Sequence, residues 1–355
     1  MLKLRIVSWK RRLCTSIVAI TGLTMAVAGF TRVGAAQAAA PEARSDGRPG
    51  DNPWPGHGIP PKLVGYLPDY DGSYADFAKS LDFSKMTHLY LAFGLPPTCD
   101  GVCTKDSDMT FALGQTDADI HTLVKAAHQA GTKVVLSIGG GGGDQQILQF
   151  YDAGLSKELV RSLNKYVAEH DLDGVDLDIE DPDHMGQPYL EFTKTLIETF
   201  HPQGKIVTAA VAEYLQDSMP DQALHLFDFV NIMNYSNYSD ATQAMTYYNE
   251  TKKVPKEKMT LGVPFFAQSG DGNIEETFST VIAAYPNAFD MDMVSGGSLD
   301  GGVTLYYVGG PSMARQTELG KQYGGIMIWE LSQDAAPPNS LYKVIEEHFP
   351  PKRRW

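Results

Sequence analysis

Short apolar runs recur along the chain from residue 62 onward, and amphipathic segments separate them. Eight of these runs are rich in β-branched and aromatic residues, at 62–67, 87–94, 133–138, 174–180, 205–212, 229–235, 259–266 and 325–331. Most are apolar at consecutive positions, which is typical of parallel strands that are covered on both faces. The pattern therefore predicts eight buried strands.

Between these runs, apolar residues recur at helical spacing. In 117–130 one face collects Ile120, Leu123, Val124 and Ala127, and Thr116 with Asp119 resembles a capping box. The same periodicity predicts helices at 156–170, 188–200, 240–250, 311–323 and 340–348. Eight strands that alternate with helices predict an α/β fold of the (β/α)8 TIM barrel type.

Two features of the chain qualify this prediction. A doubly wound open sheet is the alternative, but the glycine-rich stretch 139–143 lacks the G-x-G-x-x-G spacing of a dinucleotide site. We expect these glycines to allow a close backbone approach at the end of the third strand. The longest connection, 267–324, is expected to hold one or two helices and a short extended piece at 303–308. We interpret it as a short embellishment between strands 7 and 8.

The first 61 residues differ from the rest of the chain. Basic residues precede an uncharged, mostly apolar run from Leu13 to Phe30, and Ala36-Gln37-Ala38 fits an A-x-A cleavage site. We predict a secretory signal peptide at 1–38, a flexible linker at 39–61 and a catalytic barrel at 62–349. An uncleaved membrane anchor is the alternative. Cleavage implies a secreted or periplasmic protein with no stable membrane association.

Composition narrows the choice of partners and cofactors. Apolar residues make up 43% of the chain and charged residues 20%, as in globular proteins, and the net charge of −14 disfavours nucleic acid as a partner. Outside the signal peptide only Cys99 and Cys103 remain, and an even pair in an exported protein suggests a disulfide. Free thiols or half of a metal site are the alternatives. Because no second Cys/His cluster exists to complete a metal site, we expect no bound metal. We also expect the protein to be a monomer.

Three carboxylates occupy alternate positions of the run 174–180. Asp176, Asp178 and Glu180 point to one side of a strand, and the Val, Leu and Ile between them point to the other. The carboxylates are therefore expected to face the barrel interior and to rise towards its C-terminal mouth, where active sites of barrel enzymes lie. Burial and like charge raise carboxyl pKa values, so at least one of the three should hold a proton near neutral pH. A general acid needs such a proton.

Two other interpretations of these carboxylates are less favoured. An exposed acidic edge would not alternate with Val, Leu and Ile. A Mg²⁺ or Ca²⁺ site would more often recruit His or further acids from neighbouring strands. The other predicted strand ends offer instead Phe93, Tyr235 and Trp329, whose rings suit stacking against sugars.

The motif around these carboxylates resembles that of a known family. Asp173-Gly174-x-Asp176-x-Asp178-x-Glu180 matches the D-G-x-D-x-D-x-E motif of family 18 glycoside hydrolases, the chitinase-like barrels. Shorter family patterns are matched at other strand ends by Ser137-Ile138-Gly139-Gly140, Ala92-Phe93, Met233-Asn234-Tyr235 and Trp329. The resemblance covers about 62–349, essentially the whole predicted barrel.

This resemblance implies a mechanism and a set of site residues. Glu180 is expected to protonate the glycosidic oxygen while the substrate's own acetamido carbonyl attacks the anomeric carbon, with net retention. Asp178 is expected to orient the acetamido group, with Asp176 below it, and Tyr235 to bond the acetamido oxygen. The residues expected to line the sugar site are Tyr66, Phe93, Gly139, Met233 and Trp329. No metal or cofactor is implied.

The resemblance leaves the substrate open within one chemistry. It implies an exported, endo-acting chitinase that cleaves β-1,4-linked N-acetylglucosamine in chitin or chitooligosaccharides. The alternatives are an endo-β-N-acetylglucosaminidase that acts on N-glycans and a non-catalytic chitin-binding lectin, which is disfavoured because all four acidic motif positions are present. Two positions depart from the family pattern: Ile179 replaces a frequent Trp, and Ser236 replaces a frequent Asp that would tune the site.

Overall fold

Eight parallel strands close into a barrel in this computed structural model, which describes residues 60–297 and 299–349. The predicted signal peptide and nearly all of the predicted linker lie outside the described residues. The strand order around the barrel is β1-β12-β7-β6-β5-β4-β3-β2. The strands are β1 (Lys62–Pro68), β2 (His88–Gly94), β3 (Lys133–Gly139), β4 (Gly174–Asp178), β5 (Ile206–Ala212), β6 (Val230–Met233), β7 (Met259–Pro264) and β12 (Gly325–Trp329). This closure confirms the predicted (β/α)8 fold and excludes the doubly wound open sheet.

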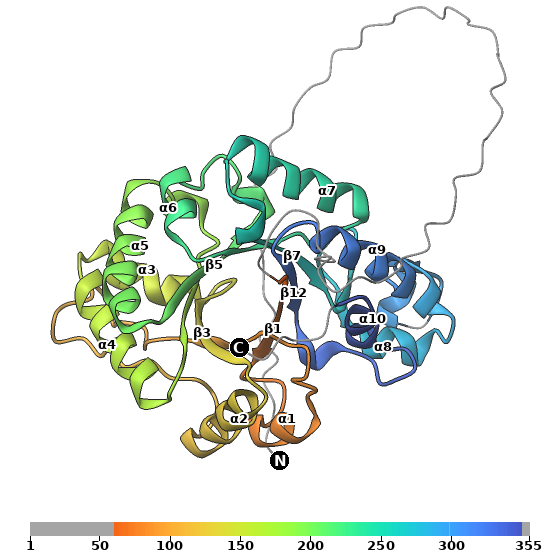
Figure 1. The fold of residues 1–355 in the computed structure, drawn as a ribbon, viewed down its shortest axis with the longest axis horizontal. Helices are drawn as coiled ribbons and strands as arrows, with labels where there is room; N and C mark the ends of the chain where they lie inside the picture. Colours follow the sequence, from red (N-terminus) through yellow and green to blue (C-terminus); the bar gives the residue numbers. More distant parts are fainter. Residues whose placement is uncertain (1–59, 298, 350–355) are drawn as a thin grey trace, which may run out of the picture. The chain divides into compact units, whose positions relative to one another are not determined.

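Helices surround the strands (Figure 1). They are α1 (Tyr74–Ser80), α2 (Asp117–Gln129), α3 (Asp144–Asp152), α4 (Ser156–Glu169), α5 (Gln187–Phe200), α6 (Asp221–Leu226), α7 (Tyr238–Thr246), α8 (Phe278–Ala284), α9 (Gly310–Gly320) and α10 (Leu341–His348). The six predicted helices are confirmed with ends shifted by a few residues. The periodicity did not identify α1, α3 and α6. The short helix α8 lies in the connection 267–324, which was expected to hold one or two helices.

The first two residues of the acidic motif serve the fold. The Asp173 carboxylate accepts hydrogen bonds from the Val134 N–H at 2.7 Å and from His128 Nε2 at 2.8 Å, so it ties the start of β4 to β3 and α2. A Cβ at Gly174 would lie 2.1 Å from the carbonyl oxygen of Ile206 on β5, closer than any side chain can come. The Asp-Gly pair therefore fixes how the start of β4 packs against β3, α2 and β5.

The long connection between β7 and β12 contains α8 and α9, which confirms the expected one or two helices, and a small sheet that was not expected. It contains a four-stranded antiparallel sheet, in the order β10-β11-β8-β9, together with α8. The strands are β8 (Phe266–Ser269), β9 (Glu275–Thr277), β10 (Met293–Val294) and β11 (Leu305–Tyr306). Of the extended piece predicted at 303–308, only β11 is strand. Segments of two to four residues are too short to show an alternating pattern, which is why the sequence did not predict this sheet.

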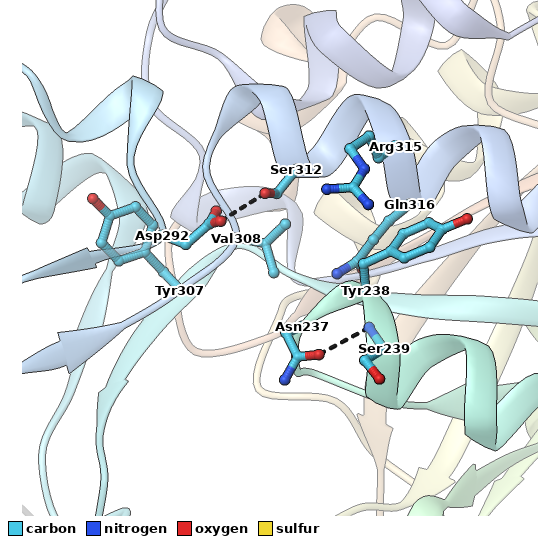
Figure 2. Close-up of a pocket in the computed structure, with 9 residues that line it drawn as sticks. All are labelled: Asn237, Tyr238, Ser239, Asp292, Tyr307, Val308, Ser312, Arg315 and Gln316. Carbon is cyan, nitrogen blue, oxygen red and sulfur yellow. Dashed lines mark hydrogen bonds between the residues drawn. The ribbon is translucent and has the colours of Figure 1, made fainter. Parts of the chain in front are cut away.

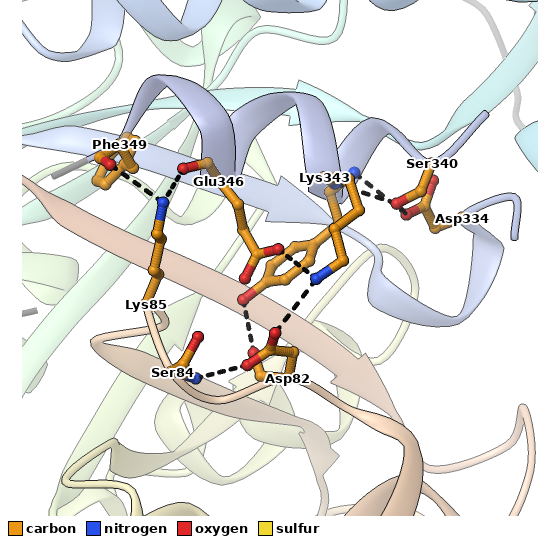
Figure 3. A network of polar contacts seen from close by, with 9 residues as sticks. Asp82, Ser84, Lys85, Asp334, Ser340, Lys343, Glu346 and Phe349 are labelled. Carbon is orange, nitrogen blue, oxygen red and sulfur yellow. Dashed lines mark hydrogen bonds and ion pairs between the residues drawn. The ribbon is translucent and has the colours of Figure 1, made fainter. Parts of the chain in front are cut away.

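A polar network holds α10 against the loop that follows α1 (Figure 3). Lys343 Nζ lies 3.2 Å from an Asp82 carboxylate oxygen and 2.6 Å from one of Glu346. At the start of the helix, the partly buried Asp334 carboxylate accepts the N–H groups of Leu341 and Tyr342 at 2.8 and 3.1 Å. Asp334 thus satisfies backbone donors at the start of α10 that have no partner within the helix.

Replacing Asp334 by alanine tests this capping arrangement. Asp334→Ala leaves buried N–H groups without acceptors, so we expect the free energy of unfolding to fall by about 2 kcal/mol. Lys343→Met is the matched control in the same network. Its ion pairs are partly exposed, so we expect a loss below about 1 kcal/mol. Chemical denaturation of both variants measures the difference, and equal losses would contradict the assignment.

Candidate active site

Asp176 lies at the centre of the barrel, fully removed from solvent. Its Oδ2 accepts the hydroxyls of Tyr66 and Ser137, each at 2.8 Å, and its Oδ1 accepts the Thr208 hydroxyl at 2.6 Å. Burial raises the pKa of this carboxyl above its usual range, while the three hydroxyl donors act in the opposite direction. Three strands, β1, β3 and β5, therefore supply the partners of one buried acid.

Asp178 lies one step nearer the mouth and has a different environment. It is buried, and among the described residues its Oδ1 atom has no hydrogen-bond partner. Burial raises the pKa of Asp178 well above its usual range, and the negative charges of Glu180, Asp176 and Asp144 raise it further. The pKa of Asp178 is thus shifted upward, the direction that burial and like charge are expected to produce in this cluster.

Glu180 is held from two sides at the barrel mouth. The strand ends at Asp178, two residues earlier than predicted, and Glu180 follows on the loop. Its N–H donates to Asp144 Oδ2 at 3.2 Å, and the Tyr214 hydroxyl donates to Glu180 Oε2 at 3.0 Å. Asp144 is the first residue of α3, and Tyr214 lies on the turn that follows β5.

The sequence analysis missed Asp144 and Tyr214. Both follow the C-terminal end of a barrel strand, and this position is the signal that could have identified them. Neither belongs to a recognisable motif, and their contacts with Glu180 span 36 and 34 residues of sequence. Only the closed barrel brings these three residues together.

Two glycines at the end of β3 allow the close approach that the sequence predicts there. A Cβ on Gly139 would lie 2.1 Å from the carbonyl oxygen of Asp178, and one on Gly140 would lie 2.4 Å from the Phe93 ring. Both glycines have positive φ, +104° and +80°. The Gly140 N–H donates to the Asp178 carbonyl at 2.8 Å, which fixes the backbone beneath that carboxyl. Packing therefore accounts for Gly139, and its contact with a sugar stays a prediction.

Aromatic rings from several strands gather beside the carboxylates. Phe93 and Trp329 are nearly parallel, with ring centroids 5.6 Å apart and an interplanar angle of 23°. The Tyr66 ring lies 5.7 Å from Trp329, but it is only 1% exposed and its hydroxyl bonds Asp176. The structure thus gives Tyr66 a role in holding Asp176, and its contact with a sugar stays a prediction.

Tyr235 follows β6 by two residues and is electrostatically coupled to the carboxylates. Burial raises its pKa well above the usual range, and the charges of Asp178 and Glu180 add to this. Its ring packs edge-on against Phe266 at 5.5 Å. Met233, the last residue of β6, is partly buried near the same ring cluster, and its contact with substrate stays a prediction.

The two departures from the family motif have separate structural consequences. Ile179 is 1% exposed and belongs to the main apolar core, as expected for a residue that points out of the barrel. The Ser236 hydroxyl donates to Asp240 Oδ2 at 2.7 Å, and its carbonyl accepts the Gln316 side-chain amide at 2.8 Å. Ser236 is thus engaged with the start of α7 and with α9.

A pocket of about 280 Å³ lies between the N-terminal parts of α7 and α9 (Figure 2). The Arg315 guanidinium lies 4.5 Å from the centre of the Tyr238 ring on one side. On the other side Asp292 accepts the Ser312 hydroxyl at 2.7 Å. None of the residues predicted for the site lines this pocket, so it is distinct from the carboxylate cluster.

The structure joins Cys99 and Cys103 in a disulfide, as the sequence predicts. The bridge lies in the loop between β2 and α2, and the Cys99 N–H donates to Gln149 of α3 at 2.9 Å. In the described part of the chain, no three His, Cys, Asp or Glu side chains are placed to hold a metal ion. The helices within 60–297 and 299–349 include none with the length and apolar character to cross a membrane.

Comparisons with known proteins agree with this geometry. Residues 62–334 match the model of glycosyl hydrolases family 18. A family 18 chitinase from Flavobacterium johnsoniae superposes with a TM-score of 0.68 at 27% identity, covering 81% of this chain and 94% of that one.

Curated relatives match over smaller shares of their length. An acidic endochitinase of Cicer arietinum is 26% identical over 227 residues, which are 60% of this chain and 67% of that protein. A chitinase-like effector of Moniliophthora perniciosa is 32% identical over 123 residues, 34% of this chain and 26% of that protein. The matched segments thus cover about a quarter of the length of one of these relatives and two thirds of the length of the other.

Asp178→Asn tests the electrostatic cost of the site. In the unfolded chain the Asp178 carboxyl ionises at its ordinary pKa, whereas in the folded protein its pKa is higher. As the pH rises above the ordinary pKa, Asp178 therefore contributes less to the stability of the folded state. We therefore expect Asp178→Asn to raise the melting temperature by roughly 3 °C at pH 8, with the gain disappearing near pH 4.

Asp173→Asn is the matched control for this measurement. It weakens a structural acceptor of the Val134 N–H, so it should lower the melting temperature at both pH values. Thermal unfolding of both variants across this range provides the comparison. A melting temperature of Asp178→Asn that stays at the wild-type value at pH 8 would contradict the charge burial.

Proposed function

Because this chain belongs to family 18 of the glycosyl hydrolases, we propose that it cleaves β-1,4-linked N-acetylglucosamine in chitin or chitooligosaccharides. The observation that carries the proposal is Asp178 Oδ1, a buried acceptor two residues before Glu180 that has no donor among the described residues. A buried acceptor of this kind costs free energy unless a ligand satisfies it. The N–H of an acetamido group is a donor of the required kind.

The chemistry begins with two groups on opposite sides of the glycosidic bond. Glu180 transfers its proton to the glycosidic oxygen while the acetamido carbonyl oxygen of the same sugar attacks the anomeric carbon, which gives an oxazolinium ion and releases the leaving sugar. In its ionised form, Asp178 accepts the acetamido N–H and balances the positive charge as it develops. Tyr235 bonds the acetamido oxygen and holds it in line with the anomeric carbon.

The second half of the reaction uses Glu180 in the opposite sense. Its carboxylate removes a proton from water, which attacks the anomeric carbon from the side that the leaving sugar vacated, so the configuration is retained. Tyr214 and Asp144 act as positioning residues, because one holds the Glu180 carboxylate and the other holds its backbone N–H. Asp176 supports Asp178 from below, and Trp329 with Phe93 offers an apolar surface for the sugar ring.

The route of the protein out of the cell belongs to the same proposal. A signal peptide at 1–38 would deliver the barrel to a compartment in which the Cys99–Cys103 disulfide can form. Secretion also brings the enzyme to a substrate that is too large to enter a cell. We propose endo-acting cleavage by a monomer, with no metal or cofactor.

A non-catalytic sugar-binding protein is the second candidate, because one relative is a chitinase-like effector. Product analysis distinguishes the candidates when colloidal chitin, chitooligosaccharides and a high-mannose glycoprotein are incubated side by side. Release of chitooligosaccharides supports the chitinase. Release of intact glycans supports the endo-β-N-acetylglucosaminidase, and binding without products supports the lectin.

Glu180→Gln tests the general acid. The amide cannot donate the proton, so we expect the rate on chitooligosaccharides to fall by roughly 10²–10⁴. The Gln side chain has nearly the same shape and can still bond Tyr214, so the melting temperature should stay within about 2 °C of the wild type. Steady-state rates and thermal unfolding measure both quantities. Activity within a few-fold of wild type would remove Glu180 from this role.

The requirement for the acetamido group tests the mechanism separately. We expect retention at the anomeric carbon and negligible turnover of fully deacetylated or cello-oligomers, because these substrates lack the nucleophile. A thiazoline analogue of the oxazolinium ion should inhibit more strongly than the parent sugar. NMR of the first-formed anomer and oligomer hydrolysis assays provide the measurements. An inverted first product would show that water attacks directly.

A further inference from the structure

The loop that carries Glu180 is fastened to both ends of α3. At the first residue of this helix, Asp144 accepts the Glu180 N–H at 3.2 Å. In the last turn, the Tyr151 hydroxyl donates to the carbonyl of His184 at 3.4 Å. The loop 180–184 is therefore held against α3, and the position of Glu180 depends on these contacts.

The His184 ring joins this loop to the end of α3. Its Nδ1 lies 3.0 Å from Asp181 Oδ2, and its Nε2 lies 3.2 Å from Asp152 Oδ2. Asp181 follows Glu180 directly, and Asp152 is the last residue of α3. The Gln145 side-chain amide of α3 also donates to Asp181 Oδ2, at 3.3 Å. We call Asp181, His184 and Asp152 the His184 bridge.

The geometry of the His184 bridge fits a charged ring. An ionised carboxylate only accepts hydrogen bonds, and a neutral imidazole has one N–H donor, so a neutral ring would direct a lone pair at one of the two carboxylates. An imidazolium donates from both nitrogens. Burial acts to lower the pKa of His184, but the hydrogen bonds and charges of Asp152 and Asp181 outweigh it, so the pKa is raised above its usual value.

The titratable groups around this ring come from α3 and from the loop itself. Tyr151 of α3 lies edge-on to it, with ring centroids 6.3 Å apart, and burial raises the Tyr151 pKa, so its hydroxyl stays neutral. Asp183 precedes His184, and its N–H donates to Asp181 Oδ1 at 2.9 Å. The next helix, α5, has no charged residue in its first turn. Among the described residues, Asp152 and Asp181 are the charges that shift His184.

We propose that His184 is a positioning residue for Glu180, and that it holds the loop fully in place only while its ring is charged. As an imidazolium it fastens Asp181 to α3, beside the carboxyl that must lie within hydrogen-bond distance of the glycosidic oxygen. When the ring loses its proton, one of its two hydrogen bonds is lost. The inference rests on the proposed function, because it assigns a role in that reaction.

The direction of the pH effect follows from the raised pKa of His184. The His184 bridge is complete at mildly acidic pH, and it is weakened as the pH rises through the pKa of the folded protein. Loss of the bridge displaces Glu180, and a small displacement of a catalytic group lowers the rate without a matching change in substrate binding. We therefore expect the effect in kcat and not in KM.

His184→Phe tests the bridge, because it keeps a ring against Tyr151 but has no donor at any pH. His201→Phe is the matched control. His201 Nε2 lies 3.0 Å from Asp228 Oδ2, but this pair precedes β5 and β6 and so lies at the opposite end of the barrel from Glu180. Steady-state rates on chitooligosaccharides are measured between pH 5 and pH 9, and thermal unfolding shows that each variant is folded in the assay.

We expect kcat of the wild type to exceed that of His184→Phe by about tenfold at pH 5 and by less than about threefold at pH 9, with KM changed by less than about twofold. The ratio of the two rates removes the ionisation of Glu180, which both proteins share. His201→Phe should follow the wild type throughout. A ratio that stays constant with pH would overturn the inference, as would an equal loss of rate in His201→Phe.

Asp152→Asn gives a second test that does not depend on the folding of His184→Phe. Its amide can donate to a neutral ring as well as accept from a charged one, so the bridge no longer needs the imidazolium. Asp152→Asn should therefore keep a larger share of its pH 5 rate at pH 9 than the wild type does, by about twofold. NMR titration of the His184 ring should give a lower pKa in Asp152→Asn than in the wild type, and equal pKa values would overturn the bridge.

The same measurements separate this inference from the proposed function. If the wild type hydrolyses chitooligosaccharides and Glu180→Gln does not, while His184→Phe follows the wild type at every pH, the hydrolase stands and the positioning role does not. If the wild type hydrolyses no N-acetylglucosamine oligomer at any pH, there is no general acid to position, and both are overturned.

Discussion

A carboxylate in the core of a protein must be surrounded by hydrogen-bond donors, and the interior of this barrel is organised around that requirement for Asp176. Hydroxyls from β1, β3 and β5 reach it directly. Asn231 of β6 then donates to Tyr66, and Thr260 of β7 donates to Asn231. Tyr90 of β2 also bonds the Thr208 hydroxyl. Side chains from six strands therefore form a network around the acid of a seventh, β4, so strand register and the position of that acid depend on each other.

The contrast between Asp176 and Asp178 follows from this network. Three hydroxyl donors reach Asp176, whereas Asp178, two residues further along the chain, is buried with Oδ1 unpartnered among the described residues. Natural sites accept such a cost where a ligand later satisfies the group. The Gly139 backbone packs so closely against the Asp178 carbonyl that a side chain at position 139 has no room. The fold thus holds Asp178 Oδ1, an acceptor with no partner among the described residues, two residues before Glu180.

The mouth of the barrel is assembled from segments that are distant in sequence. Asp144 after β3 and Tyr214 after β5 hold Glu180, and β8 begins against Tyr235. In this arrangement the barrel strands present the charged groups, and the connections add the positioning contacts.

The sequence by itself determined the barrel, the alternation of inward carboxylates with outward Val175, Leu177 and Ile179, and the disulfide pair. These features depend on local periodicity and spacing, which a chain of amino acids displays directly. Only the tertiary structure decided which side chains bond Asp176, that Asp144 and Tyr214 hold Glu180, and that Tyr66 is buried. The same holds for the small sheet, whose strands are too short to show a pattern. Hydrogen bonds and charge effects of this kind depend on distances across the closed barrel, and no local pattern in the chain records those distances.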